Sequence, residues 1–562
     1  MKYANWNVPE RGAEIPRALL AAGCTPLLAA ILHLRGLSDP AAARSFLRGG
    51  AETLTNPLEL TGMVDAVQRL TRAVATGEHV AVYGDYDVDG ITAACLLTDY
   101  LRFRGLTCEL RIPDRISEGY GLNTAAIDAL AEEGVTLIVT VDCGVTNLEE
   151  TAYAAQRGVD MIVTDHHECR EALPEAEAVV DPKQPDSSGV GTALAGVGVA
   201  FKLVCAMEGD AEKMLARYGD LVAVGTVADV MPLLGENRFI TRCGLQKIAA
   251  GDCRPGFLAL AEEAGVRDKP FTASTVGFSL APRINAAGRL GEPSLAVRLL
   301  EETDLRRARV LAAELCAKNR ERQALEMEIW REAVERLHGE QPDAPIVLAS
   351  EGWHPGVIGI VASRLTDAYS VPAVMICLDG ESGKGSCRST GSFNLFEALS
   401  ACSDCLEGFG GHAMAAGVTV RRGCVDELRS RLREYYLSHP DRTLPALEAD
   451  LLVDSPELLT MACVESLDEL EPCGNGNPRP LLYMENVSLD SVQPIGGGKH
   501  LRLKLAKFGQ TYDGVFFSQT APALGARAGQ RCDIVFAPQI NEFHGRRSVQ
   551  LVITDLRRSK EG

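Results

Sequence analysis

Between about residues 78 and 230, short apolar segments alternate with stretches of helical length. The expected strands are His79–Gly84, Thr136–Asp142, Asp160–Asp165 and Ala178–Pro182, and the expected helices include Ile91–Gly105 and Asn123–Gly134. Strands that are apolar on both faces and joined by helices indicate a parallel sheet covered on both sides. The sequence therefore predicts an α/β fold whose first domain is a doubly wound parallel sheet.

Further along the chain, Asp304–Leu337 contains no Gly or Pro and carries apolar residues at helical spacing. Such a helix would extend about 50 Å and is typical of a bridge between two domains. A second α/β unit follows, with strands expected at Ala344–Ser350 and Pro372–Leu378 and a helix at Gly356–Tyr369. From about residue 447 the apolar residues recur with period two, which predicts a small β-barrel.

The length of 562 residues exceeds what a single core usually supports, so several domains are expected. We expect an N-terminal helical segment at 1–50, a catalytic domain at 51–300, a connecting helix at 301–340, a second α/β domain at 341–440 and the barrel at 447–560. The segment Pro440–Pro445 is the expected boundary before the barrel.

Composition limits the compartment and the partners. The chain has no apolar run long enough for a transmembrane helix and no secretory signal, and its 17 cysteines are typical of reduced thiols in a cytoplasmic protein. The pair Cys402 and Cys405 is interpreted as helix packing rather than as a metal or redox pair. A net charge of −20 is a weak argument against nucleic acid, because a local basic groove can coexist with an acidic exterior.

Acidic residues stand where the expected strands end. These are Asp85, Asp87 and Asp89, then Asp142, then Asp165 with His166 and His167, and Asp229 after a further apolar run. The carboxyl ends of parallel strands meet at one edge of a sheet, so these side chains should converge. Clustered carboxylates need compensating charge, and two divalent cations would supply it and suit phosphoryl transfer. Asp142 is the favoured bridging carboxylate.

Each motif alone has a simpler interpretation. The Asp-x-Asp-x-Asp-Gly run could be a calcium loop, but Leu96 stands where such a loop needs Glu. A single Asp after a strand is usually a turn or N-cap residue, and His166–His167 could be a surface pair. Their joint occurrence favours the metal site, with Mn²⁺ or Mg²⁺ preferred over structural zinc.

Four motifs, GDYDVDGITA, VDCG, TDHHE and GTVADVMPLLGENR, resemble those of the DHH phosphoesterase family. Further runs resemble an exonuclease branch of that family, and the resemblance covers about residues 40 to 555. They lie at 115–123, 194–203, 282–291, 352–365, 385–395, 408–417 and 472–480.

The resemblance implies a role for each residue of the acidic cluster. Asp89, His166 and Asp229 would hold one divalent cation, and Asp142 would be shared. Asp87 and Asp85 would hold the second cation, with Mn²⁺ or Mg²⁺ as the ions. His167 would orient the substrate or the nucleophile, with Asp165 as its partner, in catalysis by two-metal activation of water.

The resemblance also implies a phosphate site in the family's second domain, DHHA1. Its substrate-binding residues would be Ser386, Arg388, Ser389 and His412, where glycine-rich turns let the backbone approach phosphate. Arg388 would receive a terminal 5′-phosphate, with further phosphate contacts from Arg115, Arg283 and Arg289. Cys387 stands where glycine is common. Any single Arg here could instead form a surface salt bridge.

The barrel resembles an OB-fold, which binds single strands through basic and aromatic side chains. Its candidate contacts are Lys499, His500, Arg502, Lys504, Phe516 and Phe517, although alternating basic residues are equally typical of a solvated strand face.

The resemblance implies a metal-dependent 5′-to-3′ exonuclease that degrades single-stranded DNA to mononucleotides in recombination and repair. Its partners would be the single-stranded-DNA-binding protein and a RecQ-type helicase. One alternative is a phosphodiesterase of short oligoribonucleotides or cyclic dinucleotides, but such relatives generally lack the barrel. Another is an inactive scaffold, but such members lose ligand aspartates that this chain retains.

Overall fold

The computed structural model describes residues 3, 5–115, 117–119, 121–187, 189–339, 341–440, 443 and 446–559. The chain forms two compact units. Unit 1 comprises Met1–Gly49, Thr443–Glu471 and Asn477–Gly562, and unit 2 comprises Gly50–Arg442 and Pro472–Gly476. Residues 441, 442, 444 and 445 of the expected boundary lie outside the described residues. No helix among the described residues is long and apolar enough to cross a membrane.

Unit 2 begins with a five-stranded parallel sheet in the order β3-β2-β4-β5-β6. Its strands are β2 (His79–Gly84), β3 (Thr107–Arg111), β4 (Leu137–Val141), β5 (Asp160–Thr164) and β6 (Ala178–Val180). Alternate residues of β2 face opposite cores: Val80 and Val82 pack in one, Ala81 and Tyr83 in the other. Both faces are therefore buried, as their apolar sequences predict.

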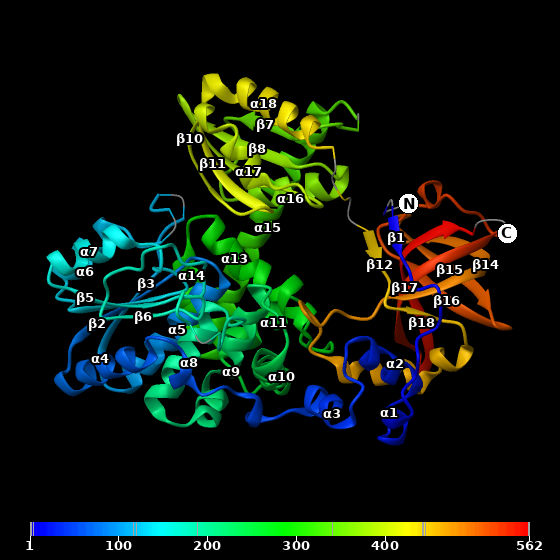
Figure 1. Ribbon diagram of the computed structural model, residues 1–562, viewed down its shortest axis with the longest axis horizontal. Coiled ribbons are helices and arrows are strands. Elements are labelled where there is room, and N and C mark those ends of the chain that lie inside the picture. The colour runs from blue at the N-terminus through cyan, green and yellow to red at the C-terminus, as the bar shows by residue number, and fades with distance from the viewer. Residues whose placement is uncertain are drawn as a thin grey trace. The chain divides into compact units, whose positions relative to one another are not determined.

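Helices cover both faces of this sheet, which confirms the doubly wound domain (Figure 1). One side carries α4 (Met63–Thr76), α5 (Val88–Phe103) and α8 (Gly196–Glu208), with α9 (Ala211–Ala228) packed on α5 and α8. The other side carries α6 (Thr124–Glu132) and α7 (Leu148–Gln156).

A helical layer follows in unit 2. It consists of α10 (Gly235–Ala250), α11 (Pro255–Glu263), α12 (Ala273–Thr275), α13 (Ala281–Arg289) and α14 (Pro293–Glu301). A π-helical turn, Val276–Leu280, joins α12 to α13 just before Pro282. Proline has no N–H to donate, so the widened turn accommodates it without ending the helix.

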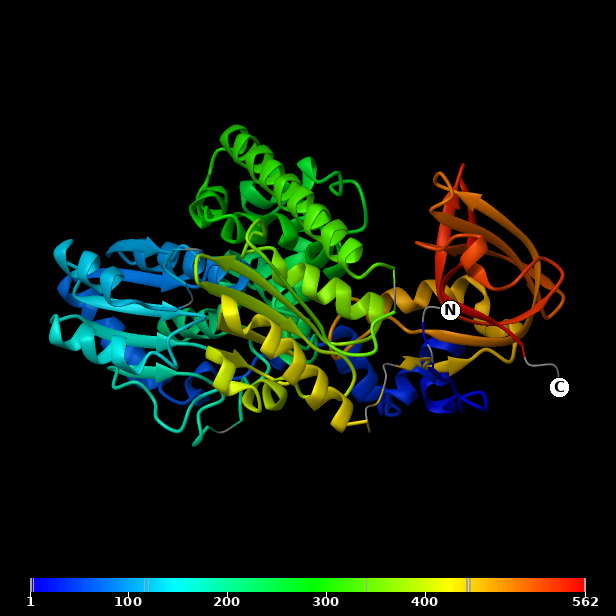
Figure 2. The same cartoon turned by 90° about the horizontal axis from the view of Figure 1, so that it is seen from above.

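The helix α15 (Leu305–Arg336) is the bridge that the sequence predicts. Asp304 caps it by accepting a hydrogen bond from the Arg307 amide at 2.9 Å. Ala308 and Ala312 pack in the core of the first sheet, whereas Ile329 and Ala333 pack in the core of the second sheet. Figure 2 shows α15 as the long green helix.

The second sheet of unit 2 has the order β10-β11-β9-β8-β7. Its elements are β7 (Ile346–Ser350), α16 (Ile358–Tyr369), β8 (Ala373–Asp379), β9 (Ser382–Arg388), α17 (Leu395–Ser400), β10 (Leu406–Gly411), β11 (Ala415–Arg421) and α18 (Val425–Ser438). The expectation of a glycine-rich turn at Ser386–Arg388 was wrong, because these residues end strand β9 and bury Cys387 in the core. Cys402 and Cys405 are buried, free thiols in this core, as the packing interpretation requires.

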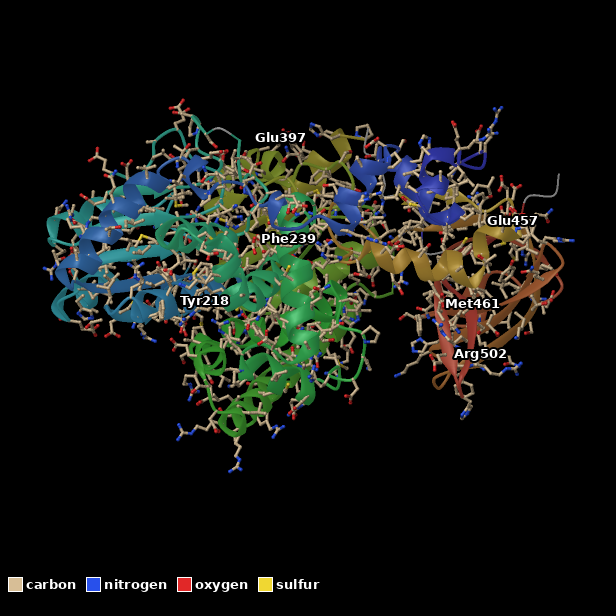
Figure 3. All side chains as sticks on the ribbon, turned by 90° about the horizontal axis from the view of Figure 1, so that it is seen from below. Tyr218, Phe239, Glu397, Glu457, Met461 and Arg502 are labelled. Carbon is tan, nitrogen blue, oxygen red and sulfur yellow. The ribbon has the colours of Figure 1, made fainter. Side chains whose placement is uncertain are left out.

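Unit 1 contains a closed barrel in the order β14-β15-β16-β18-β17, with β17 returning to β14. The strands are β14 (Leu482–Ile495), β15 (His500–Lys507), β16 (Gln510–Phe516), β17 (Arg531–Phe543) and β18 (Arg546–Arg558), and the short β13 (Leu451–Leu452) pairs with β14. On β15, Leu501 and Leu503 face inward while Arg502, labelled in Figure 3, is exposed. Phe516 is buried opposite Leu501, so proposing it as a DNA contact was wrong.

The N-terminal segment folds with this barrel in unit 1. It comprises β1 (Asn5–Asn7), α1 (Arg17–Ala21), α2 (Pro26–Leu34) and α3 (Pro40–Arg48), and it meets β12 (Ala446–Glu448) and α19 (Met461–Ser466). The Trp6 indole donates to Asp555 Oδ2 at 3.1 Å, and the Thr25 and Ser466 hydroxyls lie 2.6 Å apart. Both ends of the chain thus form one unit.

Candidate active site

The acidic motifs meet at the carboxyl edge of the first sheet. Strand β2 lies between β3 and β4, so the chain's winding reverses direction between β2 and β4. Ligands bind in such sheets at this switch point, outside the carboxyl ends of the strands. Asp85 directly follows β2 and Asp142 directly follows β4, so both flank the switch point.

The segment after Asp85 turns directly into α5. Asp87 caps this helix, because its Oδ1 accepts hydrogen bonds from the amides of Asp89 at 2.8 Å and Gly90 at 3.1 Å. Asp89 in turn accepts hydrogen bonds from the amides of Gly196 at 2.6 Å and Val197 at 2.8 Å, at the beginning of α8. Two helix N-termini therefore fix two of the aspartates.

Asp142 occupies a tight and strained position. Its φ is +59°, in the left-handed region that non-glycine residues rarely adopt. Such backbone strain concentrates at functional sites. Gly196 lies directly against it, since a Cβ on Gly196 would come 2.5 Å from the Asp142 Cβ. Only glycine lets α8 approach this carboxylate.

Carboxylates and imidazoles of the described residues gather into overlapping groups that could each hold a metal ion. The His166 Nε2 atom lies 3.1 Å from Asp142 Oδ1, 3.5 Å from Asp229 Oδ2 and 3.8 Å from Asp89 Oδ2. The groups are Asp89, His166 and Asp229; Asp85, Asp87 and Asp142; and Asp142, His166 and His167. Asp142 belongs to two of them, which is the geometry expected of a bridging ligand.

The electrostatics of this cluster suit cations. Asp85 Oδ1, Asp142 Oδ1 and His166 Nε2 are buried and have no hydrogen-bond partner within the described part of the chain. Burial, together with the neighbouring Asp87, raises the pKa of Asp85 to about 8, and burial with the Asp89 charge raises the pKa of Asp142 as well. Burial and the charge of His167 lower the pKa of His166 to about 4, which leaves a neutral imidazole. Buried acceptors of this kind fit divalent cations.

Asp165 has a different environment from the other acids. Its Oδ1 accepts a hydrogen bond from the His166 amide at 2.8 Å and lies 2.7 Å from His167 Nδ1, while its Oδ2 accepts one from the Val145 amide at 3.0 Å. Burial works against the ionised Asp165 carboxylate, but these hydrogen bonds lower its pKa. The same contact raises the pKa of His167 to about 9 against the effect of burial. Asp165 therefore orients the two histidines.

A group of arginines adjoins the acidic cluster within unit 2. Burial and the charges of Arg115, Arg322 and Arg388 lower the pKa of Arg289 to about 10, while Asp87 acts in the opposite direction. Arg289 Nη1 donates to the Gly356 carbonyl at 3.2 Å, and Arg388 Nη1 donates to the Cys387 carbonyl at 2.8 Å. These residues form what we call the arginine cluster: Arg115, Arg289, Arg322 and Arg388.

The structure brings only some of the predicted substrate residues to this cluster. Ser386 Oγ and Arg388 Nη2 both face the start of α16, 3.3 and 3.4 Å from where a Cβ on Gly359 would stand. Arg283 instead donates to the Ser279 carbonyl at 2.5 Å and to Cys316 Sγ at 3.3 Å. The Ser389 hydroxyl donates to the Phe393 carbonyl at 2.7 Å. His412 is exposed in the turn between β10 and β11.

Three residues near the site escaped the sequence analysis. Tyr86 lies between the two clusters, with the Arg115 guanidinium 4.9 Å from its ring centroid, and its place inside the acidic motif was a usable signal. Arg322 comes from α15, where nothing in the sequence separates it from the helix's other charges. Asp181 follows β6 and is fully buried, which the rule of strand-end acids could have found.

Comparison with known proteins agrees with this geometry. The DHH family N-terminal domain matches residues 79–226, the DHHA1 domain matches residues 327–437 and the RecJ OB domain matches residues 450–555. The single-stranded-DNA-specific exonuclease RecJ of Bacillus subtilis (strain 168) is 40% identical over 541 residues, covering 94% of this chain and 68% of the relative. The chain belongs to the RecJ family.

Two solved RecJ structures from Thermus thermophilus are similar to the whole chain. The RecJ complex with Mn²⁺ has a TM-score of 0.84 and 31% identity, covering 99% of this chain and 80% of that one. The complex with Mg²⁺ has a TM-score of 0.79 and 30% identity, covering 99% and 79%. These RecJ structures thus contain the two ions that the donor set of this chain suits.

Proposed function

We propose that this chain is a RecJ-type exonuclease that hydrolyses single-stranded DNA from the 5′ end to mononucleotides, in recombination and repair. The observation that carries the proposal is Asp142, which belongs to two candidate ligand groups that share one buried edge. The family's activity on single-stranded DNA and the RecJ OB domain at residues 450–555 support DNA over short oligoribonucleotides or cyclic dinucleotides.

The residues of the acidic edge would hold two divalent cations, Mn²⁺ or Mg²⁺. Asp89, His166 and Asp229 would bind one ion, and Asp85 and Asp87 the other. Asp142, whose Oδ1 lies 3.1 Å from His166 Nε2, would be shared between them. When bound, the cations would supply the positive charge that stabilises phosphodiester hydrolysis and favours deprotonation of the attacking water. Asp165 holds His167 beside the ligands, where a protonated imidazole can donate a hydrogen bond to a phosphate oxygen.

The arginine cluster would hold the 5′ end of the strand. Arg388 and Ser386 face the first turn of α16, where backbone amides and the helix dipole favour an anion. A planar guanidinium can donate two parallel hydrogen bonds to two oxygens of a terminal phosphate. A 5′-hydroxyl has a single oxygen and cannot accept both. The distance between this cluster and the acidic edge would then decide which phosphodiester is cut.

The test is digestion of single strands labelled at either end, with Mn²⁺, Mg²⁺ or EDTA, by wild type and by Asp142→Ala. We expect mononucleotides to be released from the 5′ end with either cation, and activity to be lost with EDTA or in the variant. Release from the 3′ end alone, or full activity of the variant, would contradict the proposal.

The cellular setting is also a proposal. None of the 17 cysteines, all of which lie within the described residues, forms a disulfide, which supports a reducing, cytoplasmic compartment. The single-stranded-DNA-binding protein and a RecQ-type helicase are proposed as partners from family resemblance. Co-purification of each with the full chain, in the presence of nuclease to exclude bridging DNA, would test this.

A further inference from the structure

The segment Pro472–Gly476 belongs to unit 2, although the chain on either side of it belongs to unit 1. It lies against the turn that follows Asp229 at the end of α9. The Asn475 side-chain amide donates to the Val230 carbonyl at 2.8 Å, and the Leu233 amide donates to the Asn475 carbonyl at 2.8 Å. Asn475 is therefore hydrogen-bonded to the turn at two points, through its side-chain amide and through its backbone carbonyl.

This turn has an unusual backbone. Val230, directly after Asp229, has a φ of +57°, and a β-branched residue in the left-handed region is a genuine outlier. The strain cannot be attributed to core packing, because the Val230 side chain is 65% exposed. The cap of α9 contributes to it, because the Val230 amide donates to the Val227 carbonyl and the Met231 amide donates to the Thr226 carbonyl, each at 3.2 Å, as in a Schellman motif. That motif usually has glycine at the left-handed position, so a valine there needs further support from surrounding contacts.

Several contacts anchor the segment itself. The buried Arg238 donates to the Pro472 carbonyl at 3.1 Å. Gly474 allows close approach, because a Cβ there would come 2.7 Å from Leu233 Cδ1. Asn237, also buried, donates to the carbonyl of Pro232 at 3.1 Å and to that of Ala193, just before the helix whose amides hold Asp89. The segment is therefore a fixed support rather than a loose linker.

We propose that Asn475 is a positioning residue for the metal centre, which reinforces the left-handed Val230 at the cap of α9 and so aims the Asp229 carboxylate at His166. Without this contact the turn after α9 relaxes, and Asp229 no longer lies 3.5 Å from His166 Nε2. The inference rests on the proposed role of Asp229 as a metal ligand. It also gives a structural role to the segment at 472–480, which was identified from the sequence only by resemblance.

The test measures Mn²⁺ affinity of the full chain by calorimetry, without DNA. We expect Asn475→Ala to weaken Mn²⁺ binding about tenfold, as is usual when a residue that orients a ligand is lost. Asn56→Ala is the matched control, because the Asn56 side chain also supports a local turn, by accepting a hydrogen bond from the Leu58 amide at 3.1 Å. That variant should bind Mn²⁺ like wild type, and melting in EDTA checks that both variants fold.

A second substitution separates positioning from a general loss of structure. Glycine adopts the left-handed conformation without cost, so Val230→Gly added to Asn475→Ala should recover most of the Mn²⁺ affinity. Unchanged affinity in Asn475→Ala, or no recovery in the double variant, overturns the inference. Asp229→Ala separates failure of the inference about Asn475 from failure of the proposed metal site. If Asp229→Ala also binds Mn²⁺ like wild type, the proposed metal site itself is wrong.

Discussion

The acidic edge of the first sheet and the arginine cluster are opposite in charge, but both contain charged side chains that lack a neutralising partner among the described residues. At the acidic edge, buried oxygens of Asp85 and Asp142 lack hydrogen-bond partners in the described chain. In the arginine cluster, Arg289 and Arg388 donate to backbone carbonyls. Arg322 is paired with Glu326 on its own helix, whereas no ion pair of the described residues joins Arg289 or Arg388 to a carboxylate. One region would attract cations and the other an anion, and a phosphodiester strand with divalent cations would satisfy both.

This contrast explains how a chain of net charge −20 can bind a polyanion. Net charge describes the whole surface, whereas binding depends on the local field. Part of the negative charge is gathered at the edge that cations would neutralise, and the positive charge proposed to contact DNA is concentrated in a few guanidinium groups.

The largest effect is expected at the acidic edge, from Gly196→Ala. Its new Cβ would stand 2.5 Å from the Asp142 Cβ, so α8 and the shared carboxylate must move apart. We expect hydrolysis to fall about 100-fold, because small displacements of reacting groups have effects of that size. The loss should be equal for strands with 5′-phosphate and with 5′-hydroxyl, measured as initial rates.

Gly198→Ala on the same helix is the control, since its Cβ would meet only the flexible Leu194 side chain at 3.1 Å. Wild-type rates in Gly196→Ala would show that the acidic edge tolerates displacement and is not a tightly built metal site.

Substitution in the arginine cluster should instead discriminate between strands with a 5′-phosphate and strands with a 5′-hydroxyl. Arg388→Ala is expected to lower kcat/KM on 5′-phosphorylated strands about tenfold, with little effect on 5′-hydroxyl strands, because only the phosphate uses the guanidinium fork. Lys384→Ala, exposed on the same strand β9, should leave both substrates unaffected. An equal loss on both substrates would remove the proposed 5′-phosphate role of Arg388.

Protonation of the acidic edge should give a smaller effect, a change of thermal stability with pH. Burial raises the pKa of Asp85 to about 8 and that of Asp229 to about 7, with Asp87 adding to both. Because the folded state then binds more protons than the unfolded state, stability in EDTA should rise as pH falls from about 9 to 6. We expect Tm to rise by about 2–4 °C.

Excess Mn²⁺ should weaken or reverse this trend, since metal ligands must lose their protons. Asp85→Asn should flatten the profile in EDTA. Identical slopes with and without Mn²⁺ would contradict the assignment of these carboxylates to a cation site.

The smallest effect is expected in the barrel. Arg502 is exposed on β15, whereas Lys504 on the same face forms a 2.8 Å ion pair with Asp513. Arg502→Ala should weaken binding of a single strand about two- to fivefold, at the level of one phosphate contact, and Lys504→Ala should do less. Fluorescence anisotropy in EDTA measures both. An equal or larger loss of single-strand affinity in Lys504→Ala would indicate that the ion pair with Asp513 does not reduce the contribution of Lys504 to binding.

Much of the acidic edge could be predicted from sequence, because apolar strands, strand-end acids and parallel winding together force Asp85 and Asp142 to one place. The long helix was also predictable, since α15 lacks Gly and Pro throughout and carries its own cap at Asp304. These features depend on local pattern and on general rules of sheet winding.

Other features depend on contacts between distant segments, which local pattern does not encode. Arg322 joins the arginine cluster only through the packing of α15, and Asn475 reaches the Val230 carbonyl, 245 residues away in the chain. Phe516 was misjudged because an aromatic residue at a strand end has the same local pattern whether it faces the barrel core or solvent. Trp6 likewise gives no sign that it donates to Asp555.

The most direct test of the central claim is anomalous diffraction at the manganese edge from crystals of the full chain grown with Mn²⁺. We expect two peaks at the acidic edge, both in contact with Asp142, one beside His166 and Asp229 and the other beside Asp85 and Asp87. A single peak, or two peaks that do not share Asp142, would contradict it.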